Sequence, residues 1–152
     1  MSQDLDEYRL LIADVYELAG ASRRTSDVLA AVLGQTAARW HVMSVVSDEP
    51  MSVSSAARRL GLARQSVQRV VDDLVGAGQL SIRPDPTDRR APLVSLTPAG
   101  GATLAALVEA SRADREVVLA RAGVGAAELA RVRSVVRALA EAVAGSDPGD
   151  DD

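Results

Sequence analysis

The stretch that decides the fold runs from Ser52 to Gly78 and reads SVSSAARRLGLARQSVQRVVDDLVGAG. Ser52 is suited to cap a first helix, and Gly61 permits a tight turn after it. A second helix is predicted from Ala63 to about Ala77. Apolar residues at helical spacing predict the buried faces, which are Val53, Ala56, Ala57 and Leu60 in the first helix and Val67, Val70, Val71, Leu74 and Val75 in the second. Two helices joined by a turn of about three or four residues that contains Gly are typical of a helix-turn-helix.

A hairpin is predicted directly after the second helix. Gly78 ends that helix, and residues 80–83 alternate apolar and polar as a short strand does. Residues 93–96 indicate the returning strand, and the turn-rich segment 84–92 between them carries Arg89 and Arg90. A hairpin in this place is the wing of a winged helix.

Helices are expected on both sides of this module. On the N-terminal side the pattern predicts a helix over residues 5–19, which is broken at Gly20 and the polar residues 22–26. A second helix is predicted over 27–33, and a third from the cap Thr36 through Val46. On the C-terminal side, Thr97 and Pro98 open a helix to about residue 121, and a last helix covers 126–144. The expected fold is therefore mainly α with a small β-hairpin wing.

The two outermost helices each carry a narrow apolar stripe. Its residues recur at spacings of 3, 4, 3 and 4, a pattern that favours pairing with another helix. The N-terminal stripe is Leu5, Tyr8, Ile12, Val15 and Ala19, and the C-terminal stripe is Leu129, Val132, Val136, Leu139 and Val143. The stripes can meet within one chain as core, or across a two-fold axis in a homodimer. We expect the homodimer, because neither stripe has a full partner in so small a domain.

These elements divide the chain into four parts. We expect dimerisation helices over residues 1–35 and 98–145, a winged helix-turn-helix lobe over 36–97, and a disordered acidic tail over 146–152.

The composition excludes several classes of function. The chain has no Cys, no Lys and one His, which excludes disulfides, thiolate metal sites and most nucleophilic and Schiff-base chemistry. We expect no enzymatic activity, no metal and no cofactor. The first residues are acidic where a secretion signal is basic, and no apolar run is long enough to span a membrane, so we expect a cytoplasmic protein.

The charge distribution favours a nucleic-acid partner although the formal net charge is −4. Residues 51–92 hold seven Arg and four acidic residues, a local charge of +3, whereas the remainder holds ten Arg and seventeen acidic residues, or −7. A basic middle between acidic ends is typical of a DNA-contacting module on a scaffold that does not touch DNA.

Two segments resemble the MarR (multiple antibiotic resistance regulator) family. They are ARRLGLARQSVQR at residues 57–69 and DPTDRRAPLVSLTPAG at residues 85–100, and the order of predicted elements is similar over nearly the whole chain. The resemblance implies a homodimer that binds a pseudo-palindromic operator, usually as a repressor released by a small ligand or by oxidation. The chain departs from the family at Ala63, where Ser or Thr is frequent, and at Thr87, which replaces the first Arg of an Asp-x-Arg-x-x-Arg pattern. Arg90 matches the second Arg.

The residues expected to contact double-stranded DNA lie on the recognition helix, the helix before it and the wing. Gln pairs with adenine edges and Arg with guanine in the major groove, and an arginine at a wing tip can enter the minor groove. Asp88 is a candidate for orienting such an arginine. The candidates are Ser52, Ser54, Arg64, Gln65, Ser66, Gln68, Arg69, Asp88, Arg89 and Arg90. The alternative for each is a solvated polar face, and for Ser52 a plain helix cap.

Two further interpretations are open. Arg39, Trp40 and His41, with Tyr16 nearby, form a candidate pocket for a small aromatic or anionic effector, since Arg pairs with carboxylates and Trp stacks. Their alternative is packing of the core and hinge. The alternative for the whole chain is a winged helix that binds another protein and not DNA, although such a module is expected to expose apolar or acidic residues where this chain has Arg and Gln.

Overall fold

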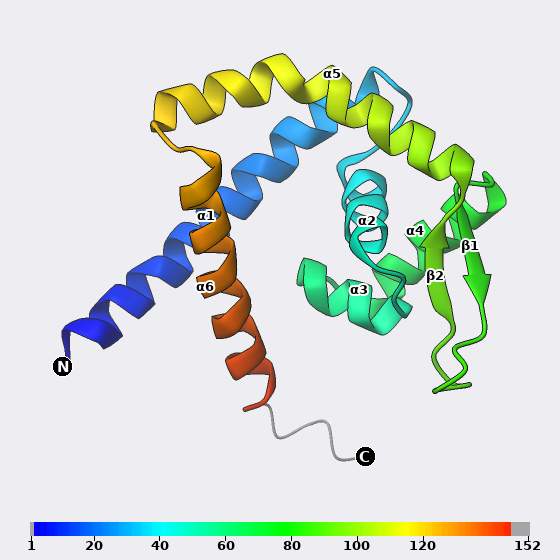
Figure 1. The fold of residues 1–152 in the computed structure, drawn as a ribbon, viewed down its shortest axis with the longest axis horizontal. Helices are drawn as coiled ribbons and strands as arrows, with labels where there is room; N and C mark the ends of the chain where they lie inside the picture. Colours follow the sequence, from blue (N-terminus) through cyan, green and yellow to red (C-terminus); the bar gives the residue numbers. More distant parts are fainter. Residues whose placement is uncertain (1, 147–152) are drawn as a thin grey trace. The chain divides into compact units, whose positions relative to one another are not determined.

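The computed structural model describes residues 2–146, and Figure 1 shows their ribbon. Its elements in chain order are α1 (Gln3–Ala31), α2 (Ala37–Asp48), α3 (Val53–Leu60), α4 (Arg64–Gly76), β1 (Leu80–Arg83), β2 (Leu93–Leu96), α5 (Pro98–Ala122) and α6 (Ala126–Ala144). The described residues form two compact units, which divide between Ser111 and Arg112. The predicted acidic tail lies, apart from Ser146, outside the described residues.

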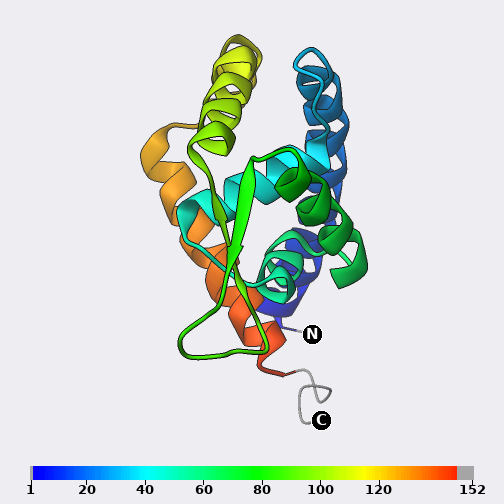
Figure 2. The ribbon, with the colours of Figure 1, turned by 90° about the vertical axis from the view of Figure 1, so that its right-hand side faces the viewer.

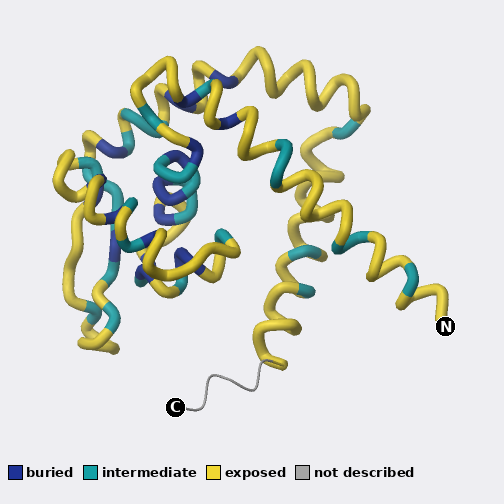
Figure 3. Tube along the Cα trace, turned by 180° about the vertical axis from the view of Figure 1, so that it is seen from behind, coloured by how far each residue is buried: buried dark blue, intermediate teal, exposed yellow. Residues whose placement is uncertain are grey.

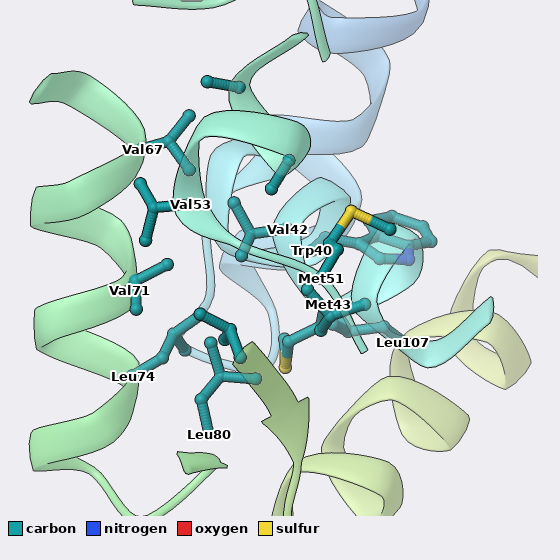
Figure 4. Packing of buried hydrophobic residues seen from close by; sticks show 14 of the residues in the cluster. Trp40, Val42, Met43, Met51, Val53, Val67, Val71, Leu74, Leu80 and Leu107 are labelled. Carbon is teal, nitrogen blue, oxygen red and sulfur yellow. The ribbon is translucent and has the colours of Figure 1, made fainter. Parts of the chain in front are cut away.

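The core of the first unit is built around α2. This helix contacts α1, α3, α4 and β2, and the buried residues in Figure 3 concentrate there. Figure 4 shows how side chains from the surrounding elements pack against it. With no Phe in the chain, the core is aliphatic and thioether-rich, with Trp40 as its one aromatic member. The largest fully buried apolar side chains come from α2, α4, β2 and α5 and are Val42, Met43, Val67, Val71, Leu74, Val94 and Leu107.

The helix-turn-helix is confirmed, with the predicted caps. The backbone N–H of Ser55 donates to Ser52 Oγ at 3.1 Å, which caps α3. Gly61 ends α3 in the left-handed region at φ +63°, where a side chain would be strained, and Leu62 N–H then donates to the Ala57 carbonyl at 3.0 Å. The predicted inward faces of α3 and α4 are buried or half-buried except for Val75, which is exposed because it lies past the last buried turn of α4.

The wing is an antiparallel hairpin with Leu80 opposite Leu96 and Arg83 opposite Leu93. Figure 2 shows its two strands side by side, with the loop of residues 84–92 at their far end. Met51, just before α3, pairs with Val94 through two backbone hydrogen bonds of 2.8 and 3.2 Å. This bridge fixes the base of the wing against the start of α3.

The predicted break in the N-terminal helix is wrong. Residues 3–31 form one continuous helix through Gly20. A single Gly costs only about 1 kcal/mol in a helix interior. Of the polar residues after it, 22–25 are exposed and Ser26 is buried as part of the same helix, so nothing forces the chain to turn there. The helix ends at Ala31, and the chain changes direction at Gly34, whose φ is +68°. Asp27 on α1 accepts the Ala37 N–H at 2.8 Å and so joins α1 to the start of α2.

The second unit contains the end of α5 and α6. Within α6 no residue is buried, and Figure 3 shows this helix almost entirely in the colour of exposed residues. Val136 and Leu139 of the C-terminal stripe are half-buried, whereas Val132 is 56% exposed. Among the described residues, no helix combines the length and apolar character that crossing a membrane requires.

Candidate nucleic-acid interface

Three elements of the first unit meet at a cleft of about 140 Å³. The start of α3, the first turns of α4 and the wing line it. The apolar part of the lining is Val53, Ile82, Ala91, Pro92 and Val94. The cleft brings together five of the residues expected to contact DNA, which are Ser52, Ser54, Arg64, Gln68 and Arg90. These residues are up to 38 positions apart in sequence, so the fold assembles them.

The first residues of α3 line this cleft, together with the cap Ser52. Ser52 Oγ caps the helix and also donates to Ser55 Oγ at 3.0 Å, while Arg58 Nη2 donates to Ser55 Oγ at 3.4 Å. The capping role expected as the alternative for Ser52 is therefore present. Ser54 is exposed beside it. Helix N-termini with free N–H groups favour anions such as phosphate.

The outward face of α4 carries the other predicted contacts. Burial of Val67, Val71 and Leu74 turns Gln65, Ser66 and Arg69 toward solvent. Gln68 is half-buried at the edge of the cleft, and its Nε2 donates to Asp72 Oδ1 at 2.9 Å. Ala63 makes no side-chain cap, so the N–H groups of the first turn of α4 lack a hydroxyl partner there.

The two acidic residues of α4 are both engaged by neighbouring side chains. Asp73 Oδ2 lies 3.7 Å from Arg39 Nη2 on α2, and Asp72 accepts from Gln68. Neither of these two contacts was predicted from the sequence. The spacing of four residues between Gln68 and Asp72 was a usable signal for their pairing, whereas the contact with Arg39 depends on tertiary structure.

The acidic residues of the wing tip shape its turns. Asp85 Oδ1 accepts from the Thr87 backbone N–H at 2.9 Å and from Thr87 Oγ1 at 2.8 Å, and these two hydrogen bonds lower the pKa of Asp85 below its usual 3.8. Asp88 Oδ1 accepts the backbone N–H of Arg90 at 2.9 Å. Asp88, expected to orient an arginine side chain, therefore binds the main chain of Arg90. The side chains of Arg89 and Arg90 are exposed.

The four candidate effector residues lie in different surroundings. Trp40 is 4% exposed and belongs to the core cluster, and His41 beside it is half-buried. Arg39 forms the ion pair with Asp73, and Tyr16 on α1 is 77% exposed. The position of Trp40 agrees with the alternative of core packing. An effector site at these residues stays a prediction.

Known proteins resemble this chain in sequence and in fold. The model of the MarR family matches residues 33–91. The uncharacterized protein Rv2011c of Mycobacterium tuberculosis is 51% identical over 104 residues, which cover 68% of this chain and 73% of that protein. Among solved structures, the transcriptional regulator BldR from Sulfolobus solfataricus superposes with a TM-score of 0.67 at 21% identity, covering 92% of this chain and 99% of its own.

A second solved structure with this fold is a complex with DNA. It is a mutant of MarR from E. coli complexed with operator DNA, with a TM-score of 0.62, 22% identity, and coverage of 91% of this chain and 99% of that one. At this level of identity these structures are evidence for the fold. Together with the family model and the mycobacterial relative they show that the chain belongs to the MarR family of winged helix transcription regulators.

Proposed function

We propose that this protein is a cytoplasmic homodimer that binds double-stranded DNA sequence-specifically and represses transcription from a pseudo-palindromic operator. The observation that carries the proposal is the cleft, which gathers Ser52, Ser54, Arg64, Gln68 and Arg90 from three elements onto one surface. Such a surface combines backbone N–H groups, hydroxyls and guanidinium groups for phosphates with an amide for base edges.

The roles within this surface follow from the chemistry of each side chain. Gln65, Gln68 and Arg69 project from α4 for base edges in the major groove, with Ser66 and Arg64 beside them for nearby phosphates. Arg89 and Arg90 extend from the wing toward the minor groove. Asp88 holds the turn that presents Arg90. Residues 36–97 form the DNA-binding lobe in this proposal.

Homodimerisation is supported by the exposure of the apolar stripes. In the N-terminal stripe Leu5 is 57% exposed, and in the C-terminal stripe Val132 is 56% exposed. Exposed apolar residues at regular spacing along two helices are typical of a surface that pairs with another chain. The segments 1–35 and 98–145 therefore serve dimerisation. Two recognition helices related by a two-fold axis read half-sites about 34 Å apart.

The proposal includes regulation by a small aromatic or anionic ligand. It rests on Arg39, which pairs with Asp73 of the recognition helix. A carboxylate ligand that drew Arg39 away would release Asp73, whose charge would then face the DNA-binding surface.

The experiment that tests the proposal is selection of duplex DNA from a random pool, followed by affinity measurements at two salt concentrations. The wild-type protein is expected to enrich an inverted repeat, with affinity that falls steeply with salt. Arg69→Ala and Arg90→Ala are expected to weaken binding. Arg23→Ala, which removes an exposed arginine of α1 outside the lobe, is the charge-matched control and is expected to bind as the wild type does.

Failure of the proposal has a distinct signature. If the protein enriches no site, and binds DNA equally weakly with and without Arg90, the result would instead favour a winged helix that binds another protein.

A further inference from the structure

The outward face of α4 carries a hydrogen bond that restricts one of its base-reading side chains. Gln68 Nε2 donates to Asp72 Oδ1 at 2.9 Å, one helical turn further along α4. A carboxylate only accepts hydrogen bonds, so the bond forms only when the amide nitrogen, and not the amide oxygen, faces Asp72. Asp72 therefore fixes the orientation of the Gln68 amide.

This bond also changes what Gln68 has left to offer a base. A glutamine amide has two N–H donors and one acceptor oxygen, and Asp72 occupies one of the donors. One donor and one acceptor remain. Gln68 is half-buried and lines the cleft. In the proposed complex its free amide edge is the part of the side chain that is left to meet a base in the major groove.

The remaining pair of groups matches adenine and not guanine. In the major groove adenine presents an acceptor at N7 and a donor at N6, which one N–H and one oxygen satisfy together. Guanine presents two acceptors, N7 and O6. With one N–H held by Asp72, Gln68 cannot donate to both, and its oxygen would face O6 with no hydrogen between them.

We propose that Asp72 is a positioning residue for base recognition, which restricts Gln68 to adenine by occupying one N–H of its amide. The inference rests on the proposed DNA-binding function and adds a determinant of specificity to it. It also gives a reason for a carboxylate on the recognition helix, where its charge opposes phosphate binding. The neighbouring Asp73 differs, because it pairs with Arg39 and makes no contact with Gln68 among the interactions of the described residues.

The test uses the full-length protein and the operator that it selects from random duplex DNA. Gln68→Ala first identifies the position where the preference for adenine disappears. Two dissociation constants are then measured, one for the operator with adenine at that position and one for the operator with guanine there. The ratio of the guanine value to the adenine value gives the preference. For the wild type we expect a ratio of about 5 to 100.

Three further variants separate positioning from charge. Asp72→Ala frees both N–H groups, so that Gln68 can also donate to N7 and O6 of guanine, and the ratio is expected to fall several-fold at that position only. Asp72→Glu keeps an acceptor-only carboxylate at the same spacing and is expected to preserve most of the preference. Asp73→Ala removes one negative charge from the same helix, so it is expected to raise affinity for all sequences and to leave the ratio unchanged. Both aspartates are exposed, so these variants are expected to fold.

Each result has a defined meaning. If Asp72→Ala kept the wild-type ratio, or changed the affinity equally at every operator position, the role of Asp72 would be overturned. The proposed function would remain intact. The same holds if Gln68→Ala changes no position. A wild-type protein that enriches no operator at all would overturn the proposed function, and the inference with it.

Discussion

At the scale of single residues, two adjacent glycines at the start of α5 have different surroundings. Gly100 is buried, and a Cβ added there would collide with the Gln79 carbonyl oxygen and lie 3.0 Å from Leu96 Cδ2. A Cβ on Gly101 would meet no atom within 4 Å. Gly100 therefore lets the first turn of α5 pack against the segment between α4 and β1.

We predict opposite effects of alanine at these two positions. Gly100→Ala should lower the free energy of unfolding by about 1–3 kcal/mol, because the backbone of Gln79 must move. Gly101→Ala should raise it by up to about 1 kcal/mol, since Ala favours helix over Gly. Urea unfolding at one fixed protein concentration measures both. Similar effects of the two substitutions would contradict the close approach at Gly100.

The carboxyl group of Asp85 predicts a pH dependence confined to the wing tip. Its pKa is lowered by the backbone N–H of Thr87 and then by the Thr87 hydroxyl, so the folded turn favours the ionised form. The contribution of these bonds is therefore complete above pH 3.8, the usual value, and is lost as the pH falls through the lower pKa of the folded protein.

Thr87→Val removes the hydroxyl donor and keeps the backbone donor. We expect the pKa of Asp85 to rise part of the way toward 3.8, as measured by an NMR titration of its side-chain carboxyl. An unchanged pKa would mean that the hydroxyl contributes nothing to the turn.

At the scale of elements, Thr97 joins the hairpin to α5. Its Oγ1 donates to the Gly78 carbonyl at 2.6 Å and accepts from the Gly100 N–H at 3.0 Å. One hydroxyl thus caps α5 and holds the end of β2 near the turn that follows α4. The wing and the recognition helix share this anchor, so its loss would affect both.

Thr97→Val keeps the shape of the side chain and removes both bonds. We predict a loss of about 1–2 kcal/mol in the free energy of unfolding, with Thr97→Ser close to the wild type. Thr25→Val is the matched control, because the Thr25 hydroxyl is exposed and donates only to a carbonyl of its own helix. Equal losses in Thr97→Val and Thr25→Val would show that the cap is not what stabilises this junction.

The sequence predicted those elements whose ends depend on local chemistry. Ser52, Gly61 and Thr97 mark helix ends through their own hydrogen bonds or φ angles, so the helix-turn-helix and the wing could be predicted closely. The continuity of α1 was missed because Gly20 resembles a helix stop, and nothing local indicates that the helix continues. The same limit applies to the site. The pairing of Asp73 with Arg39 and the approach of Gln79 to Gly100 join distant segments, which no local pattern encodes.

At the scale of the whole molecule, charge separates the predicted DNA-binding surface from the rest of the chain. The excess of three positive charges lies in residues 51–92, and the remaining residues carry a net charge of −7. Phosphates are therefore attracted to one part of the surface and repelled from the others. This distribution favours a single orientation of the chain on DNA. In the proposed dimer both copies would bind DNA in that same orientation.

The dimer itself is the last prediction, and α6 provides a matched pair of substitutions. Val132 belongs to the exposed C-terminal stripe, whereas Ser134 lies on the opposite face of the helix and is also exposed. Val132→Glu should place a charge in the dimer interface, and light scattering should then give the mass of one chain. Ser134→Glu adds the same charge and should leave the mass at two chains.

The same pair of variants connects dimerisation to DNA binding. A dimer binds its second half-site as an intramolecular event, so a monomer should lose affinity for the full operator on the order of 100-fold or more. It should nevertheless bind an isolated half-site as the wild type does, because Val132 is outside the predicted DNA-binding lobe. If Val132→Glu remained dimeric, the stripe would not be the interface. If it became monomeric and kept full affinity for the operator, the two lobes would bind independently and the two-fold symmetry of the operator would need another cause.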